Sequence, residues 1–299
     1  MLRLLTPKKR LKLGLGTNDL YVCASQSKKE EFKELITDLK SSFSLKEFGS
    51  EAVNEEANVL LLGGDGSLNH LINHAKSFGS LKVIYIPCGT ANDFNKTLRL
   101  NMIKPSSSLI MRIIENSPCI EIPIMACNDR YFLNVATAGE PATITESDSG
   151  LLKDYAGTLS YYLKGLSKII SPEKSTMYYS LDQSNQKQVD IFGFAVVQGL
   201  YAGGGVKLSP GSSGNFRDTF EFTFMSGKDL KEDLAAIIKL QDVESDELEK
   251  SESSLVCHRA KELSVWGDES IPLKLDGEKM SAQKLTFKKS GHFLSFYYY

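Results

Sequence analysis

Residues 60–69 read Leu-Leu-Leu-Gly-Gly-Asp-Gly-Ser-Leu-Asn, and this stretch carries the clearest signal in the chain. The four apolar residues from Val59 to Leu62 are typical of a buried strand. Glycines then leave the backbone bare, and a helical pattern follows Ser67. A strand, a glycine turn and a helix start together favour anion binding, because backbone N–H groups and the helix N-terminus face the ligand. Asp65 inside such a loop indicates that a metal or a proton is handled there; a tight turn that binds nothing is the alternative.

The 299-residue chain is 41% hydrophobic and 24% charged, with a net charge of −2. These values are typical of one large or two ordinary globular domains with a full core. So small a charge argues against binding nucleic acid, which usually needs a basic surface. No apolar run approaches the ~20 residues that span a bilayer, so we expect no transmembrane segment and at most peripheral membrane contact.

The cysteines and the N-terminus bear on the compartment. Five cysteines without the spacing of a metal pair indicate free thiols in a reducing cytosol. Met1 to Leu15 mixes leucines with five basic residues and lacks a continuous apolar core. We interpret it as a solvated basic arm and not a secretory signal; contact with an anionic membrane is the alternative.

The first third of the chain alternates apolar strands with amphipathic helices. The pattern predicts strands at 20–24, 59–62 and 81–86, and helices at 28–42, from residue 68, and at 107–115. Such alternation implies βαβ units and a parallel sheet, whose ligands lie at the carboxyl ends of the strands. Gly63–Ser67 and Pro87–Asp93 follow consecutive strands, so we expect these two loops to line one pocket.

From about Ile120 strand patterns dominate, with helical stretches at 151–170 and 228–241. The predicted strands cover residues 120–125, 131–137, 177–181, 189–198, 219–225, 262–266, 273–275, 284–287 and 293–298. They favour a β-sandwich or barrel-like second domain. We therefore predict an α/β nucleotide-binding domain over residues 1–118 and a β-rich domain over 119–299, whose extreme C-terminus can pack back on the first. A cleft between unlike domains is a common place for an active site.

A second motif, Pro-Cys-Gly-Thr-Ala-Asn-Asp-Phe, occupies residues 87–94. Gly89 allows a tight turn, and Thr90 offers a hydroxyl and an N–H to a phosphate or ribose. Asn92 and Asp93 supply polar contacts and can cap the helix that follows. Alone this is a good helix start, but its place one strand after Gly-Gly-Asp-Gly makes a phosphate site much more specific.

The two motifs together resemble the catalytic domain shared by diacylglycerol kinases, sphingosine kinases and the soluble bacterial lipid kinases. Other segments carry the resemblance further along the chain: YFLNVATAG at 131–139, AGTLSYYLKGL at 156–166, YAGGGVKLSP at 201–210 and KLDGEKM at 274–280. It extends from about Leu20 to the C-terminus, and the length and motif order fit the compact bacterial members.

The resemblance implies both a fold and a reaction. The fold is a three-layer α/β nucleotide-binding domain, similar to that of NAD kinases and phosphofructokinases, followed by a β-sandwich-like lipid domain. The reaction is transfer of the γ-phosphate of ATP to a lipid hydroxyl with Mg²⁺. The implied protein is cytoplasmic and associates transiently with a membrane surface that holds its lipid substrate, and a homodimer is left open.

The resemblance also assigns roles to residues. The nucleotide site it implies is lined by Leu62, Gly63, Gly64, Asp65, Gly66, Ser67, Leu68 and Thr90, to which the second motif adds Asn92 and Asp93. It makes Glu278 the catalytic base, and Asp65 is our second catalytic candidate. It gives Mg²⁺ the carboxylate of Asp218 and the backbone oxygens of Asn215 and Phe220.

Glu278 follows Asp276-Gly277, which is a strong signal for a type I′ hairpin. A rigid hairpin tip can aim a carboxylate into a cleft between two domains. A solvated glutamate on an exposed hairpin is the alternative reading.

Three segments depart from the family pattern. Cys23–Lys28 lacks the usual Asn-Pro and Ser/Gly loop, Gly139–Thr143 replaces a glycine-rich segment, and Thr219 replaces a glycine. They leave open a catalytically silent lipid- or nucleotide-binding module. A soluble-substrate kinase such as an NAD kinase shares the Gly-Gly-Asp-Gly loop but not the other motifs. Diacylglycerol, monoacylglycerol, phosphatidylglycerol-like and sphingoid acceptors all stay open.

Overall fold

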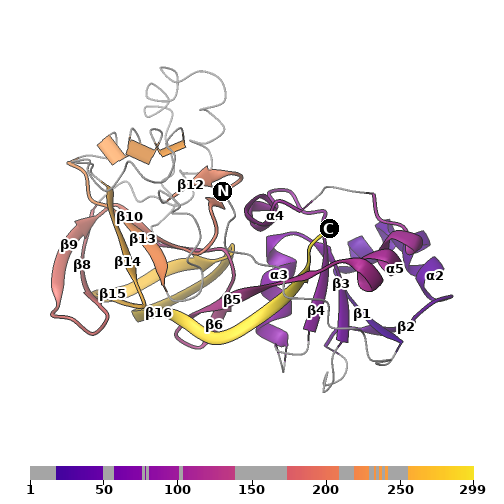
Figure 1. Ribbon diagram of the computed structural model, residues 1–299. Coiled ribbons are helices and arrows are strands. Elements are labelled where there is room, and N and C mark those ends of the chain that lie inside the picture. The colour runs from indigo at the N-terminus through magenta and orange to yellow at the C-terminus, as the bar shows by residue number, and fades with distance from the viewer. Residues whose placement is uncertain are drawn as a thin grey trace.

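The computed structural model has an α/β half and a β-rich half joined by long strands (Figure 1). It describes residues 18–49, 57–75, 78, 81–100, 104–138, 174–208, 219–228, 232–233, 236–237, 240–241 and 255–299. The predicted basic arm and the helix predicted at 151–170 lie outside these residues.

Four parallel strands form the sheet of the first half: β1 (Asp19–Ala24), β2 (Ser44–Glu47), β3 (Ala57–Gly63) and β4 (Leu81–Pro87). Their order is β2-β1-β3-β4. Three of them confirm the predicted strands. The edge strand β2 was not predicted, because it is short and its side chains lack an apolar alternation.

Helices cover both faces of this sheet, which confirms the three-layer prediction. They are α1 (Gln26–Glu31), α2 (Lys33–Leu39), α3 (Asp65–His74), α4 (Asp93–Leu98) and α5 (Ser107–Asn116). Val59 and Leu61 share a buried cluster with α3 and α4. Leu60 and Leu62 share a second cluster with α2 and α5. Successive residues of β3 thus point to opposite layers, as the pleat of a strand requires.

Two helices differ in detail from the prediction. The single helix predicted at 28–42 is divided at Phe32, where φ is −103° and ψ is 24°, although Leu35 and Leu39 of its predicted apolar face are buried. The helix α3 begins at Asp65, with Gly64 at its N-cap, so it starts three residues earlier than predicted.

The second half is built from antiparallel strands. They are β5 (Cys119–Cys127), β6 (Arg130–Phe132), β7 (Val135–Ala138), β8 (Ser175–Leu181), β9 (Lys187–Ile191), β10 (Gly193–Val197), β11 (Tyr201–Ala202), β12 (Val206–Lys207), β13 (Phe220–Met225), β14 (Leu255–Ala260), β15 (Glu262–Leu275) and β16 (Glu278–Tyr297). The main path runs β14-β13-β10-β7-β15-β16, and β8 pairs with β15. Its core is aromatic, with Phe194, Phe222, Phe224 and Phe287 fully buried.

Two long strands, β5 and β16, run between the halves. They pair antiparallel over much of their length, and near its end β16 also pairs in parallel with β4, at Phe296 opposite Val83. One sheet therefore continues through both halves. Leu294 and Phe296 enter the core under α3 and α4, and the Tyr297 hydroxyl donates to Asn58 Oδ1 at 2.7 Å.

Register shifts explain why the predicted strands were divided differently. The strands predicted at 262–266 and 273–275 are one strand, β15, whose register against β16 shifts between Trp266 and Ile271. The strands predicted at 284–287 and 293–298 are likewise one strand, with a shift against β5 after Lys289. All five cysteines are free, as predicted. In the described ranges, no helix combines the length and the apolar character needed to cross a membrane.

The last strand provides a test of how the first half is stabilised. Phe296 is fully buried and its ring lies 5.5 Å from that of Phe94, whereas Phe293 is 39% exposed. We expect Phe296→Ala to lower the free energy of unfolding by about 3–5 kcal/mol, because it leaves a cavity in the core. Urea denaturation measures the change, with Phe293→Ala as the matched control. Equal effects of the two substitutions would contradict the placement of β16 in this core.

Candidate active site at the junction of the two halves

The two glycine-containing loops begin side by side. Gly63 at the end of β3 is paired with Pro87 at the end of β4, and the Cys88 N–H donates to the Gly63 carbonyl at 2.9 Å. The loops therefore leave neighbouring strands at the carboxyl edge of the sheet, where ligands of α/β sheets bind. The arrangement brings together the two motifs as the sequence predicted.

The loops then touch at two glycines. A Cβ on Gly64 would lie 2.9 Å from the Cα of Gly89, and a Cβ on Gly89 would lie 2.6 Å from the Cα of Gly64. Neither position has room for a side chain. The Asn92 side chain holds the second turn, because its Oδ1 accepts from the Gly89 N–H at 3.0 Å and its Nδ2 donates to the Gly89 carbonyl at 2.8 Å.

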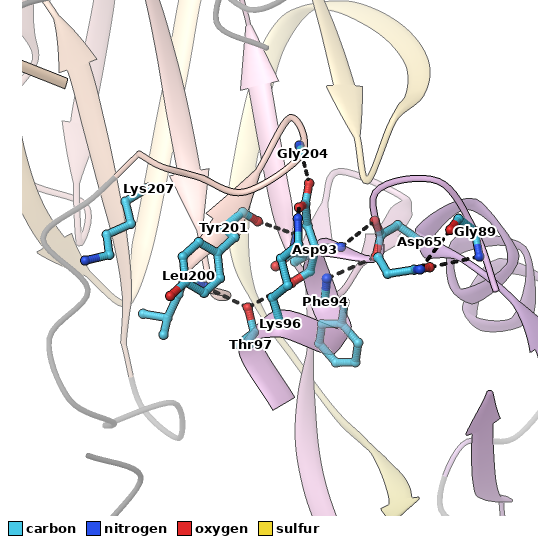
Figure 2. Close-up of polar contacts among 12 residues, drawn as sticks. Asp65, Gly89, Asp93, Phe94, Lys96, Thr97, Leu200, Tyr201, Gly204 and Lys207 are labelled. Carbon is cyan, nitrogen blue, oxygen red and sulfur yellow. Dashed lines mark hydrogen bonds and ion pairs between the residues drawn. The ribbon is translucent and has the colours of Figure 1, made fainter. Parts of the chain in front are cut away.

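Asp65 links the first loop to the helix that follows the second (Figure 2). Its carboxylate accepts from the N–H groups of Asp93 at 2.9 Å and of Phe94 at 3.0 Å, and so caps α4. The sequence offers Asn92 and Asp93 as caps, but neither side chain caps this helix: Asn92 occupies the N-cap position in a left-handed conformation with its side chain turned back to Gly89, and Asp93 is the first helical residue. Burial raises the pKa of Asp65, and the two N–H groups oppose that shift. Its predicted part in metal or proton handling stays a prediction.

Asp93 joins the same helix to the second half. Its carboxylate is buried and accepts from Lys96 Nζ at 2.9 Å and from the Gly204 N–H at 2.8 Å. One turn further on, the Thr97 hydroxyl accepts from the Leu200 N–H at 3.0 Å. Figure 2 shows these contacts between α4 and the 200–204 segment. Residues 203–205 are all glycine and form a turn, called the glycine turn below. Glycine is required at these positions because their φ values are 60°, 97° and 117°, a backbone conformation that is strained for any residue with a side chain.

Glu278 lies next to the first loop. A Cβ on Gly66 would be 3.9 Å from Glu278 Oε1, although 212 positions separate them in sequence (278 minus 66). The hairpin that carries it is type I′ as predicted, since Asp276 and Gly277 have φ values of 49° and 98° and Leu275 pairs with Glu278. The Glu278 side chain is exposed, so a ligand can reach it.

The nucleotide residues proposed from sequence differ in what they can offer a ligand. Leu62 and Leu68 have their side chains in the core, so only their backbones are available to a ligand. Gly66, in the first turn of α3, and Thr90, in the second loop, are exposed. The side chains of Asp65 and Asn92 bond to the second loop and the start of α4, and that of Asp93 bonds to Lys96 and to Gly204 of the second half, which indicates that all three shape the site.

The metal residues are only partly described. Asn215 and Asp218 lie outside the described residues, and Phe220 begins β13 with its side chain buried. In the part of the chain that the structure describes, no three His, Cys, Asp or Glu side chains are grouped to hold a metal ion. The Mg²⁺ ligand set thus stays a prediction.

Sequence reasoning missed the residues that hold the Glu278 hairpin in place. Asn69 of α3 is buried and donates to the Leu275 carbonyl at 3.2 Å. Asn73, one turn later, donates to the Tyr131 carbonyl at 2.9 Å and accepts from the Tyr131 N–H at 3.0 Å. The signal was present: two asparagines four positions apart on the apolar face of a helix need partners when buried.

Asp276 anchors the hairpin tip from the other side. Its buried carboxylate accepts from the N–H groups of Leu133 at 2.7 Å, Asn134 at 2.9 Å and Val135 at 2.9 Å. These bonds interrupt the strand predicted at 131–137, which is therefore divided into β6 and β7. Desolvation raises the pKa of Asp276 to about 6, against the effect of the three N–H groups.

The comparison with protein families identifies this region. Residues 15–122 match the family model described as the diacylglycerol kinase catalytic domain. The N-terminal part of this chain is thus similar to the diacylglycerol kinase catalytic domain. The matched residues include both loops and the helices α3, α4 and α5.

Relatives extend the kinase similarity into the second half. The chain is 28% identical to the diacylglycerol kinase of Staphylococcus carnosus over 231 residues, which are 76% of this chain and 72% of the relative. It is 29% identical to a probable YegS-like lipid kinase of Alcanivorax borkumensis over 233 residues, 77% and 74% of the two chains. The similarity to these two relatives thus extends over about three quarters of this chain.

The fold of the chain agrees with these sequence similarities. A crystal structure of a diacylglycerol kinase from Bacillus anthracis matches with a TM-score of 0.64 at 19% identity, and the match covers 94% of this chain and 96% of that chain. The similarity therefore extends over both halves and confirms the predicted fold class.

The contact between the two glycine-containing loops can be tested with alanine. We expect Gly64→Ala to destabilise the protein by about 1–3 kcal/mol, because the new Cβ would force the loops apart. Gly66→Ala is the control in the same loop: its Cβ meets nothing closer than 3.9 Å, and alanine favours a helix. Urea denaturation compares the two. A Gly64→Ala variant as stable as Gly66→Ala would contradict the close contact.

The buried carboxylate of Asp276 predicts a pH dependence. Its pKa of about 6 lies above the ordinary 3.8, so its contribution to stability is full below about pH 4 and is lost as pH rises through 6. We expect the stability advantage of wild type over Asp276→Asn to shrink by about 2–3 kcal/mol between pH 4 and pH 7. Urea denaturation across this range measures it. Asp182→Asn, at an exposed left-handed turn, controls for the turn conformation. A constant advantage would contradict the assignment.

Proposed function

We propose that this protein is a lipid kinase that transfers the γ-phosphate of ATP to a lipid hydroxyl with Mg²⁺. One observation carries the proposal: two contacting loops at the carboxyl edge of the sheet lie beside a carboxylate supplied by the other half. Relatives named diacylglycerol kinase and probable lipid kinase support the same reaction class.

The geometry suits phosphoryl transfer, which depends on positioning and charge neutralisation more than on covalent help from the protein. We propose that the bare backbone around Gly64 and Gly66 and the exposed Thr90 hold the phosphates of the nucleotide. Bound Mg²⁺ would neutralise phosphate charge, and we assign it to Asp218 with backbone oxygens of Asn215 and Phe220.

Glu278 is the proposed base. It is exposed, lies beside Gly66, and is carried by a hairpin anchored on both sides. From this position the carboxylate can take the proton of an acceptor hydroxyl as the hydroxyl attacks. A hydroxyl on a lipid has to be reached at a membrane surface, so we propose a cytoplasmic enzyme with transient peripheral docking. The acceptor lipid and a homodimer stay predictions.

The proposal predicts a base-dependent activity. Purified protein incubated with labelled ATP, Mg²⁺ and a panel of lipid dispersions is expected to label at least one lipid. We expect Glu278→Gln to lower kcat 10²–10⁴-fold, the usual contribution of a general base. Glu269→Gln, an exposed glutamate on β15, is the matched control.

Other results would assign the site differently. Absence of transfer to every lipid, with wild type equal to Glu278→Gln, contradicts the kinase proposal. Thermal stabilisation by ATP without any product would indicate a binding module. Formation of NADP in the same assay would indicate a kinase with a soluble substrate.

A further inference from the structure

Lys96 occupies a defined place between the two halves. It lies on α4, and its Nζ is 2.9 Å from Asp93 Oδ1. On its other side, a Cβ on Gly205 would lie 3.2 Å from the same Nζ, so the ammonium group packs against the bare glycine turn. The Lys96 side chain is 40% exposed, whereas that of Asp93 is 5% exposed. The lysine is thus oriented by buried groups but remains open to a ligand.

The charges around Lys96 explain why a cation is needed there. Asp65, Asp93 and Glu278 all lie at or next to the two loops, and they would repel a phosphate group. Lys96 is paired with Asp93, whose N–H group donates to Asp65, so its positive charge lies close to the loop junction where we propose that the phosphates lie.

Within the part of the chain that the structure describes, Lys96 has unused hydrogen-bond donors. An ammonium group has three N–H donors, and the Asp93 carboxylate takes one of them. The other oxygen of Asp93 is already bonded to the Gly204 N–H, so the pair is held in one orientation. Lys207, the other lysine in Figure 2, points away from this place and donates to the Gln241 carbonyl.

We propose that Lys96 binds the phosphate that is transferred, as a point charge held between Asp93 and the glycine turn. The inference rests on the proposed function and adds a phosphate-binding residue that sequence analysis did not select. The ligand is a terminal phosphate group, which is present on the nucleotide before transfer and on the lipid after it. Lysine is suited to this role because its compact charge pairs with a phosphate in several orientations.

Binding measurements can test the proposal without turnover. Isothermal titration calorimetry would compare wild type with Lys96→Met for four probes: AMP-PNP, ADP, dihexanoyl phosphatidic acid and dihexanoylglycerol. We expect Lys96→Met to weaken binding of AMP-PNP, phosphatidic acid or both at least tenfold, and to change ADP and dihexanoylglycerol less than threefold. Loss for AMP-PNP alone assigns the residue to the donor nucleotide, and loss for phosphatidic acid alone assigns it to the product.

Lys33→Met is the matched control. Lys33 also pairs with an acid three positions away, Glu30, but both side chains are 71% exposed and the pair lies on α1 and α2. We expect it to leave all four affinities unchanged. Equal losses for all four probes in Lys96→Met, or no loss for any, would overturn the proposal in favour of a purely structural ion pair.

A second measurement uses the wild-type protein, so it does not depend on a variant that folds. Acetic anhydride modifies exposed lysines, and mass spectrometry gives the rate at Lys96. We expect AMP-PNP or phosphatidic acid to slow this rate at least threefold, while ADP and dihexanoylglycerol do not; unchanged rates with all four probes would overturn the inference. Phosphate-dependent protection in a protein that transfers nothing would refute the proposed function and leave this site standing.

Discussion

The hydrogen bonds from the Asp65 carboxylate to the start of α4 are the interaction on which the rest of the site depends. They join a loop after β3 to a helix after β4, at the point where Gly64 and Gly89 are in contact. The N-terminal N–H groups of a helix have no partners within the helix, and a carboxylate is the side chain best suited to satisfy them. The acidic residue in the glycine loop therefore has a structural task, whatever further chemistry it performs.

The second half is held to this junction by buried polar groups and not only by apolar packing. Asn69 and Asn73 on α3 bind backbone groups of the second half, and Asp276 collects three N–H groups under the hairpin. Buried polar groups are costly unless they are paired, so they favour one arrangement of the two halves over others of similar apolar contact. The consequence is a fixed place for Glu278 relative to the two glycine-containing loops.

The sequence was informative where a pattern is local and less so where a contact is long-range. The buried strands β3 and β4 and the Asp276-Gly277 turn follow from apolar runs and turn chemistry, and they were predicted. The division of residues 131–137 was not, because it is caused by a carboxylate more than a hundred positions away. Lys96 was overlooked for the same reason: its neighbours on the glycine turn come together only in the fold.

The path of β16 has a consequence for how the protein folds. Leu294 and Phe296 complete the core beneath α3, yet the strands of the second half lie between them and β4 in sequence. Contacts of such long sequence separation slow folding, because a long stretch of chain has to be brought together before they form. The apolar interior of the first half is therefore complete only once the second half has returned the chain to it, and the two halves are expected to unfold as one cooperative unit.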